Sequence, residues 1–435
     1  MISTMLSKKY TLAASGVWAA SDSPAPFNYS DGDEVENRIL NQLTQVADVS
    51  LASDDLQKLI IDWPTEYHFS PLRSNLLSPF KLDRFQNILE VGSGCGAITR
   101  LLGEQCSSSD ILALEGSLRR AEITRTRCRD LSNVNVYCES FTHFEHDTPF
   151  DLITLIGVLE YSPSYFSGEN PFQTALAHAR SLLNAEGTLL IAIENQLGLK
   201  YFNGCAEDHT GKAFTGINDL YQPGTVRTFG REQLKAQIKQ AGFTHVEFIY
   251  PFPDYKLPQL LLREESFNSG NFDLSHLAGQ YRARDYGVDG ERVFHESRVW
   301  NLLAQNGLLR DLANSFLVFA SAGGASVDEI SDPWLAYTYS CRRKKRYLVE
   351  TIFSEESGTL VVDKNICYKP DNPTRENEPG TIIHHVGRAD YVRGVPYGYN
   401  LPFLLSRQGS LQAFINYLTP WYNWLREHTS SSEEN

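Results

Sequence analysis

Short apolar runs alternate with amphipathic segments through the middle of the chain. The helical periodicity predicts helices at 96–105, 117–130, 172–184 and 231–241, the last closed by Gly242 as a C-cap. The apolar runs predict seven strands, at 87–91, 110–114, 134–138, 151–156, 187–193, 244–250 and 315–320. Runs that are apolar at nearly every position are typical of strands covered by helices on both faces. The pattern therefore predicts an α/β fold built on a seven-stranded, mainly parallel sheet.

The chain divides into three predicted parts. Residues 1–80 are expected to form an N-terminal helical extension, with helices over 34–43 and 70–77. Residues 81–320 hold the predicted sheet. About sixty residues separate its last two strands, so an insertion at about 251–310 is expected to cover one edge, as a functional segment or a lid.

A linker at 321–333 leads to a predicted C-terminal α+β region, residues 334–435, of unknown role. Paired strands are expected at 334–351 and 359–367, a helix at 409–427, and disorder at 430–435.

Composition narrows the class of protein. The chain is 42% hydrophobic and 21% charged, which is typical of a folded domain, and its net charge of −14 argues against a nucleic-acid partner. No window is apolar for long enough to predict an integral membrane segment. The seven cysteines are scattered, without a C-x-x-C pair, which predicts free thiols in the cytoplasm and no zinc site. The adjacent pair His384-His385 would point to opposite faces of a strand, so no metal site is predicted.

A glycine-rich turn follows the first predicted strand. The segment runs from Glu90 through Gly92-x-Gly94-x-Gly96 into a predicted helix, and such glycines allow positive φ and close approach of a nucleotide-like ligand. Glu115, twenty-three residues past Gly92, ends the next predicted strand. A carboxylate there accepts ribose hydroxyls in dinucleotide and other nucleoside cofactors alike. These residues alone predict nucleoside binding without choosing a cofactor.

With these motifs, residues 85–260 resemble a class I methyltransferase that uses S-adenosylmethionine (SAM), and the likeness extends over roughly 25–320. It is carried by the glycine motif 90–96, the ribose motif 112–116 and the fourth-strand motif 151–160. Five further segments, 67–70, 157–161, 192–202, 207–211 and 251–256, resemble bacterial methyltransferases encoded with enzymes of cell-surface polysaccharide or O-antigen assembly. The resemblance implies a Rossmann-like sheet and SAM as cofactor. It implies cofactor contacts from Glu90, Gly92, Ser93, Gly94, Gly96, Glu115, Gly116, Glu139, Ser140, Gly157, Val158 and Leu159.

Candidate residues outside the cofactor motifs each have a functional and a purely structural interpretation. Tyr67 and Arg73 are expected to close over the methionine carboxylate of SAM, or to dock the N-terminal helices. His209, beside Asp208, is the first choice for a general base, although the segment 207–209 could equally order its loop. The other candidates are Glu194 for catalysis and Asn195, Asp254 and Lys256 for binding the acceptor, against roles in turns and surface ion pairs. Glu194 and Asn195 could also bind a metal.

The sequence therefore predicts an O-methyltransferase that acts on a hydroxyl of a sugar or glycan intermediate in cell-surface polysaccharide synthesis. Peripheral association with assembly enzymes would fit that role, and the oligomeric state is left open. Two alternatives stay open: an oxidoreductase that uses NAD(P) on a related fold, disfavoured by the lack of a Ser-Tyr-x-x-x-Lys set, and a SAM-binding scaffold without catalysis.

Overall fold

The structure is a computed structural model of the 435-residue chain. It describes residues 9–21, 32–286, 291–323, 326–341, 343, 345–367, 386–395, 399, 404 and 411–429. The expectations for residues 384–385 and 430–435 lie outside these ranges.

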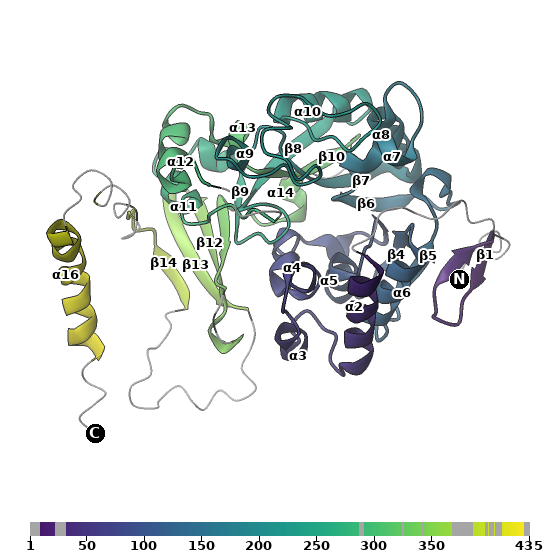
Figure 1. Cartoon of the computed structure of the whole chain (residues 1–435), viewed down its shortest axis with the longest axis horizontal. Helices are drawn as coiled ribbons and strands as arrows, with labels where there is room; N and C mark the ends of the chain where they lie inside the picture. The colour runs from purple at the N-terminus through teal and green to yellow at the C-terminus, as the bar shows by residue number, and fades with distance from the viewer. Residues whose placement is uncertain are drawn as a thin grey trace.

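Seven neighbouring strands form the centre of the sheet, in the order β5-β4-β3-β6-β7-β10-β8 (Figure 1). Their bounds are β3 Asn87–Val91, β4 Asp110–Glu115, β5 Val134–Cys138, β6 Phe150–Ile156, β7 Leu183–Glu194, β8 His245–Phe252 and β10 Ser315–Ser321. β3 to β7 are parallel, whereas β10 runs antiparallel to both β7 and β8. These are the seven strands that the sequence predicts, although β7 begins four residues earlier than expected.

The sheet extends beyond both edges of this centre, which corrects the predicted count of seven. In the described part of the chain it has fourteen strands. β1 Tyr10–Leu12 and β2 Trp18–Ala20 add to β5 at one edge. At the other edge β8 is followed by β9 Leu260–Arg263, β11 Ala336–Tyr339, β12 Val349–Glu356, β13 Thr359–Ile366 and β14 Gly387–Asp390. An edge strand has backbone N–H and C=O groups without partners. β9 pairs with β8, and β11 pairs with β9, so the predicted C-terminal region continues the same sheet.

Successive side chains of the central strands enter two different cores. Ile88 packs in a cluster with Ile98 and Leu101 of helix α5 (Ala97–Gln105). Its neighbour Leu89 packs in the other cluster, with Leu176 of α8 (Pro171–Leu182). Adjacent residues of a strand point to opposite faces, so both faces of this sheet are buried. α6 (Leu118–Arg127) covers the first face and α10 (Arg231–Gln240) the second.

The N-terminal part is only partly helical. α2 (Asp33–Gln45) packs on α6 through Ile39, Leu43 and Ile123. α3 spans Asp54–Lys58 and α4 spans Trp63–Phe69. The predicted helix over 70–77 is a 3-10 helix, η1 (Pro71–Leu76), and Ser70 accepts from Leu72 N as its N-cap.

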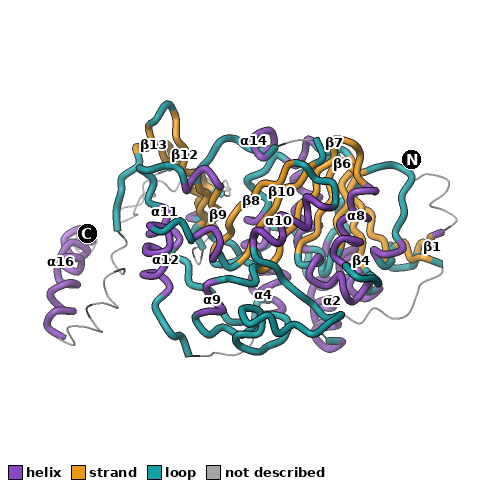
Figure 2. Tube along the Cα trace, turned by 90° about the horizontal axis from the view of Figure 1, so that it is seen from above, coloured by secondary structure: helices purple, strands orange, loops and turns teal. Residues whose placement is uncertain are grey.

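Short helices fill the connections. They are η2 Leu82–Arg84, η3 Phe141–His143, η4 Leu159–Tyr161, α7 Ser162–Tyr165, α9 Leu199–Phe202 and η6 Lys345–Tyr347. The predicted insertion adds η5 Glu264–Phe267, α11 Leu274–Ala278, α12 Glu296–Gln305 and α13 Leu309–Leu312, and the predicted linker contains α14 Val327–Ile330. Helix α16 (Leu411–Thr429) lies apart from the sheet in both views (Figures 1 and 2).

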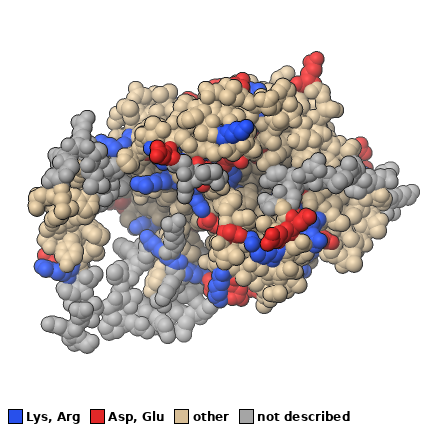
Figure 3. Space-filling view, in the orientation of Figure 1, with Lys and Arg blue, Asp and Glu red and all other residues tan. Residues whose placement is uncertain are grey.

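None of the described helices has the length and hydropathy needed to cross a bilayer. The face shown in Figure 3 carries acidic and basic side chains in neighbouring positions.

Candidate active site

The turn between β3 and α5 has the backbone conformation that its glycines permit. Gly92, Gly94 and Gly96 have φ of 73°, 57° and 81°. A Cβ on Gly92 would lie 2.6 Å from Cγ2 of Val158, so the turn also requires the absence of a side chain. The backbone can therefore approach a ligand closely at this point.

Glu115, at the end of β4, is tied to that turn. Its two carboxylate oxygens accept hydrogen bonds from Gly94 N at 2.7 Å and Ser117 N at 3.0 Å. A carboxylate oxygen accepts more than one hydrogen bond, so each oxygen retains capacity for a hydroxyl. The geometry is suited to gripping a ribose.

A cleft with about 1110 Å³ of empty space lies above the glycine turn, and we call it the cofactor cleft. Its lining includes the predicted cofactor residues Tyr67, Arg73, Glu90, Gly92, Ser93, Gly94, Glu115, Gly116, Glu139, Ser140, Gly157, Val158 and Leu159. Gly96 does not line it. A Cβ there would lie 3.1 Å from Cα of Thr124, so Gly96 instead lets the turn pack closely against α6.

Glu90 is a buried acid in the cofactor cleft. Its residue is 4% exposed, and its Oε2 has no hydrogen-bond partner among the described residues. Burial raises the pKa of this carboxyl to about 7, against smaller opposing effects of Thr99 and then Arg73. A ligand with a positive charge would satisfy this oxygen and favour its ionised form.

Two other predicted cofactor residues, Glu139 and Arg73, contact segments outside the central sheet. The carboxylate of Glu139 accepts from Tyr10 and forms an ion pair with Lys9 at 2.7 Å, so the N-terminal hairpin braces this wall of the cleft. Arg73 donates to the carbonyls of Tyr255 and Lys256, at 3.2 and 3.0 Å. Arg73 thereby joins the segment before the sheet to the loop after β8.

A second pocket, with about 860 Å³ of empty space, adjoins the first and is called the acceptor pocket below. The two share Tyr67, Gly157 and Tyr161 in their linings. The acceptor pocket is rich in charged and aromatic groups, among them Trp63, Glu160, Glu194, Lys200, Glu207, Asp208, His209, Lys256, Arg284 and Tyr286.

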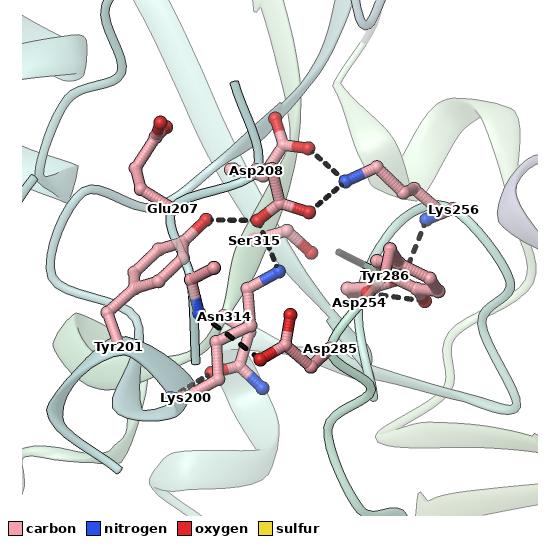
Figure 4. A network of polar contacts seen from close by, with 12 residues as sticks. Lys200, Tyr201, Glu207, Asp208, Asp254, Lys256, Asp285, Tyr286, Asn314 and Ser315 are labelled. Carbon is pink, nitrogen blue, oxygen red and sulfur yellow. Dashed lines mark hydrogen bonds and ion pairs between the residues drawn. The ribbon is translucent and has the colours of Figure 1, made fainter. Parts of the chain in front are cut away.

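Asp208 lies between two lysines in this pocket (Figure 4). Its Oδ2 is 2.6 Å from Nζ of Lys200, and its Oδ1 is 2.6 Å from Nζ of Lys256. Burial alone would raise the pKa of this carboxyl, but the two ammonium groups outweigh it and hold the pKa below its usual range. Tyr201 also donates to Oδ2, at 2.5 Å. Asp208 is therefore committed to this network and does not pair with His209, its neighbour in the sequence.

His209 pairs with Glu207 instead. Its Nδ1 is 2.8 Å from Oε1 of Glu207, and its Nε2 is 3.8 Å from both Glu160 and Glu194. Burial by itself lowers the pKa of His209, but the carboxylates of Glu194, Glu160 and Glu207 raise it to about 10. With no cation bound between these carboxylates, an imidazole with that pKa is protonated on both nitrogens at neutral pH.

Glu194 ends β7 and is fully buried, with one oxygen bound by Lys256. Glu160, in η4 after β6, is 1% exposed. Burial raises the pKa of Glu160, whereas the charges of Lys256 and His209 overcome burial and lower the pKa of Glu194. The structure thus brings Glu160, Glu194 and His209 together from three separate segments.

Two predicted acceptor residues do not line the acceptor pocket. The side-chain amide of Asn195 donates to the carbonyls of Asp311 and Ala313, at 2.8 and 2.7 Å, so it fastens the end of β7. Asp254 caps its own loop through Lys256 N and accepts from Tyr286 at 2.8 Å. Both are buried structural residues, because backbone groups and a tyrosine use their polar atoms.

Several pocket residues were not singled out from the sequence. Trp63 comes from α4, and its ring stacks on Tyr286 with centroids 4.0 Å apart. Arg284 and Tyr286 come from the predicted insertion, and Arg284 holds both oxygens of Glu66, at 2.9 and 2.8 Å. In the sequence, only the unusual length of the insertion indicated that it could contribute residues such as Arg284 and Tyr286 to a site. Glu207 belongs to the segment 207–211, one of those that carry the family resemblance. Its pairing with His209 depends on the geometry of the turn, which the sequence does not give.

Comparison with known proteins identifies the central segment. A family model described as a methyltransferase domain matches residues 89–189. Pavine N-methyltransferase of Thalictrum flavum subsp. glaucum is 28% identical over 82 residues, which are 18% of this chain and 23% of that protein. The chain thus matches less than a quarter of the length of this curated relative.

Solved structures of methyltransferases are similar at low identity. The N-methyltransferase NodS from Bradyrhizobium japonicum WM9 is 13% identical, with 57% of this chain and 92% of that chain covered and a TM-score of 0.32. Phosphoethanolamine N-methyltransferase 2 of Haemonchus contortus is 14% identical, with 60% and 56% covered and a TM-score of 0.35. At these scores the likeness carries no argument about an acceptor.

Residues 89–189 therefore match a methyltransferase domain. S-adenosylmethionine is accordingly the cofactor of this domain, in which β3, β4 and β6 carry the motifs at the cofactor cleft.

Proposed function

We propose that this protein transfers the methyl group of SAM from the cofactor cleft to an acceptor in the acceptor pocket. The observation that carries the proposal is the wall shared by the two pockets, formed by Tyr67, Gly157 and Tyr161. Methyl transfer needs donor and acceptor in line and close together, and two pockets that meet at one wall provide that placement.

The charges of the cofactor cleft support a cationic nucleoside as donor. SAM carries a sulfonium and an ammonium group, and the unpartnered Oε2 of Glu90 would accept a hydrogen bond from an ammonium. Glu115 would accept from the ribose hydroxyls, through the oxygens that Gly94 and Ser117 hold in place. In this arrangement the two acids bind opposite ends of one ligand.

For the acceptor we propose a hydroxyl of a sugar or glycan intermediate in cell-surface polysaccharide synthesis. The motifs that resemble polysaccharide-linked methyltransferases support this class, as does the lining of the acceptor pocket. Trp63 and Tyr67 offer apolar ring surface beside charged groups such as Lys200 and Arg284, and sugars present both apolar and hydroxyl faces.

Removal of the hydroxyl proton is assigned to the carboxylates of Glu160 and Glu194, which form one cluster with His209. These are the pocket residues whose polar atoms converge on one point, whereas Asp208 is occupied by Lys200 and Lys256. Of the residues expected to be catalytic, Glu194 and His209 thus keep a proposed role at the reacting atoms, and Asp208 is proposed to position the lysines.

An amine is the second candidate acceptor. The observation in its favour is the presence of unpartnered carboxylate oxygens on Glu160 and Glu194 in the part of the chain that the structure describes. An ammonium group would satisfy them, and the curated relative is named as an N-methyltransferase.

The test uses SAM with a trideuterated methyl group and glycan and amine fractions from the host, with mass spectrometry of the products. We expect a labelled O-methyl glycan. Trp63 lines the acceptor pocket and not the cofactor cleft, so Trp63→Ala should reduce transfer with little change in SAM affinity. Glu115→Ala should instead weaken SAM binding strongly. Normal SAM binding with no labelled product from any fraction would contradict transfer and favour a scaffold for polysaccharide assembly enzymes.

A further inference from the structure

Three buried side chains meet at one point in the acceptor pocket, each from a different segment. Glu160 lies in η4, Glu194 ends β7, and His209 lies in the loop after α9. Nε2 of His209 is 3.8 Å from Oε1 of Glu160 and 3.8 Å from Oε2 of Glu194, and one potential ligand atom from each residue lies within 4.8 Å of the others. Two ligand atoms that each lie ~2.1 Å from one metal ion are separated by roughly 3 to 4 Å. The 3.8 Å separations from Nε2 of His209 therefore match the spacing of metal ligands.

Three of the four carboxylate oxygens of Glu160 and Glu194 lack hydrogen-bond partners among the described residues. Both oxygens of Glu160 and Oε2 of Glu194 have no hydrogen bond within the described ranges, although the two residues are only 1% and 0% exposed. Leaving a buried charged oxygen unsatisfied is costly, so such groups in native proteins are normally bound to something.

A protonated His209 does not resolve this deficit. A hydrogen bond from Nε2–H to a carboxylate would require a separation of roughly 2.7–3.2 Å, and both separations are 3.8 Å. The imidazole therefore faces the two carboxylates across a gap. A cation in that gap would contact all three groups.

Nδ1, the other nitrogen of the imidazole, contacts a carboxylate, as is common for histidines that bind metals. Oε1 of Glu207 is 2.8 Å from Nδ1 of His209, and Oε2 of Glu207 accepts from the backbone N–H groups of His209 and Thr210, at 3.0 and 2.8 Å. A metal ion would displace the proton from Nε2 while Nδ1–H continues to donate to the fixed carboxylate of Glu207. The lone pair freed on Nε2 points at Glu160 and Glu194. A metal-binding histidine typically has such a carboxylate behind it.

We propose that Glu160, Glu194 and His209 bind one divalent metal ion, with Mn²⁺ or Zn²⁺ best suited to their mixed oxygen and nitrogen ligands. Two carboxylates and a neutral imidazole balance a charge of +2. Three protein ligands leave coordination positions open toward the acceptor pocket, as in catalytic rather than structural sites. Lys256, which binds the other oxygen of Glu194, and Glu207 would act as positioning residues.

The position of the ion suggests its task. Both carboxylates line the acceptor pocket, and a Cβ on Gly157, in the wall shared with the cofactor cleft, would lie 3.7 Å from Oε1 of Glu160. An ion there would coordinate an acceptor oxygen and lower its pKa, which prepares a hydroxyl for methylation. That task rests on the proposed function, whereas binding of the ion does not.

The experiment measures metal binding by the full-length protein without SAM or acceptor. After treatment with a chelator, the protein is titrated separately with Mn²⁺ and Zn²⁺ by calorimetry, and bound metal is counted by mass spectrometry. We expect one ion per chain and at least a tenfold weaker affinity in Glu194→Gln and in the positioning variant Glu207→Gln. His276→Gln is the matched control, because His276 pairs with Asp273 at 2.7 Å outside both pockets and should leave the affinity unchanged.

A second readout needs no variant. Pulsed electron paramagnetic resonance of the Mn²⁺-loaded wild-type protein should show coupling to an imidazole nitrogen. Failure of both ions to bind stoichiometrically, no nitrogen coupling, or unchanged affinity in a folded Glu194→Gln protein would each overturn the metal site. Because SAM is absent from these measurements, a failure here leaves methyl transfer untouched, and a failure to bind SAM leaves the metal site untouched.

Discussion

The carboxylate of Glu115 accepts a hydrogen bond from the backbone N–H of Gly94 at 2.7 Å, which ties the end of β4 to the turn after β3. The residue proposed to grip the ribose is thus held by the turn proposed to approach the ligand. A change at either residue is transmitted to the other, so the two act as one binding element.

Replacement of Glu115 should abolish most SAM binding. Glu115→Ala removes the carboxylate, and hydrogen bonds to a charged group contribute about 1.5–3 kcal/mol each, so affinity should fall roughly ten- to hundredfold or more. Calorimetric titration with SAM measures the change. Glu122→Ala is the control, because Glu122 lies outside the cleft in a loose pair with Arg119 at 3.4 Å. Equal affinity in the two variants would remove Glu115 from the site.

Gly92→Ala should impair both folding and SAM binding. Gly92 has φ of 73°, and an added Cβ would lie 2.6 Å from Cγ2 of Val158. Gly242→Ala is a matched control, since Gly242 also has a positive φ, 94°, but open space around its Cα. It should lose only about 1 kcal/mol of stability and keep its SAM affinity.

The double variant Gly92→Ala/Val158→Ala tests the cause of the loss, because it removes the clashing methyl groups. Thermal unfolding and SAM titration should show partial recovery relative to Gly92→Ala. No recovery would mean that the backbone conformation alone, rather than the contact with Val158, makes glycine necessary.

The central sheet and the cofactor cleft were predictable from the sequence because their signals are local. Each central strand is an apolar run of its own. Glu90, the glycines and Glu115 lie at or just after the ends of two adjacent strands, at fixed spacing. In a parallel sheet these strand ends meet at one edge, so a local pattern was sufficient to bring the residues together.

The acceptor pocket was not predictable in the same way. Arg284 and Tyr286 reach it from an insertion, and Trp63 reaches it from before the sheet. His209 pairs with Glu207, two residues away, and not with its direct neighbour Asp208. This pairing depends on the conformation of the turn. The fourteen-strand sheet was missed because edge pairing by β9 and β11 joins segments that the sequence separates by a linker.

The buried Glu90 should make stability depend on pH in an unusual direction. Its pKa rises from 4.5 to about 7 on folding because of burial, so the folded protein binds more protons between these values than the unfolded chain. The contribution of Glu90 is then largest below about pH 4.5 and is lost as pH rises toward 7, by about 3 kcal/mol in total.

Urea unfolding of the wild-type protein and Glu90→Gln at several pH values isolates this effect. The wild type should lose stability relative to the variant as pH rises from about 4.5 to 7, and the difference should then stay level. A constant difference across that window would mean that Glu90 titrates normally in the folded protein.

Asp208 should be a stabilising residue, because it is the acid between two buried lysines. Asp208→Asn leaves the ammonium of Lys200, 1% exposed, without its 2.6 Å carboxylate partner, whereas Lys256 keeps Glu194. Breaking one partner of a buried pair costs about 3–5 kcal/mol, measurable by urea unfolding. Adding Lys200→Met removes the stranded charge, so Asp208→Asn/Lys200→Met should be more stable than Asp208→Asn alone. If the second substitution instead lowers stability further, the two residues do not form the pair that holds this wall of the pocket.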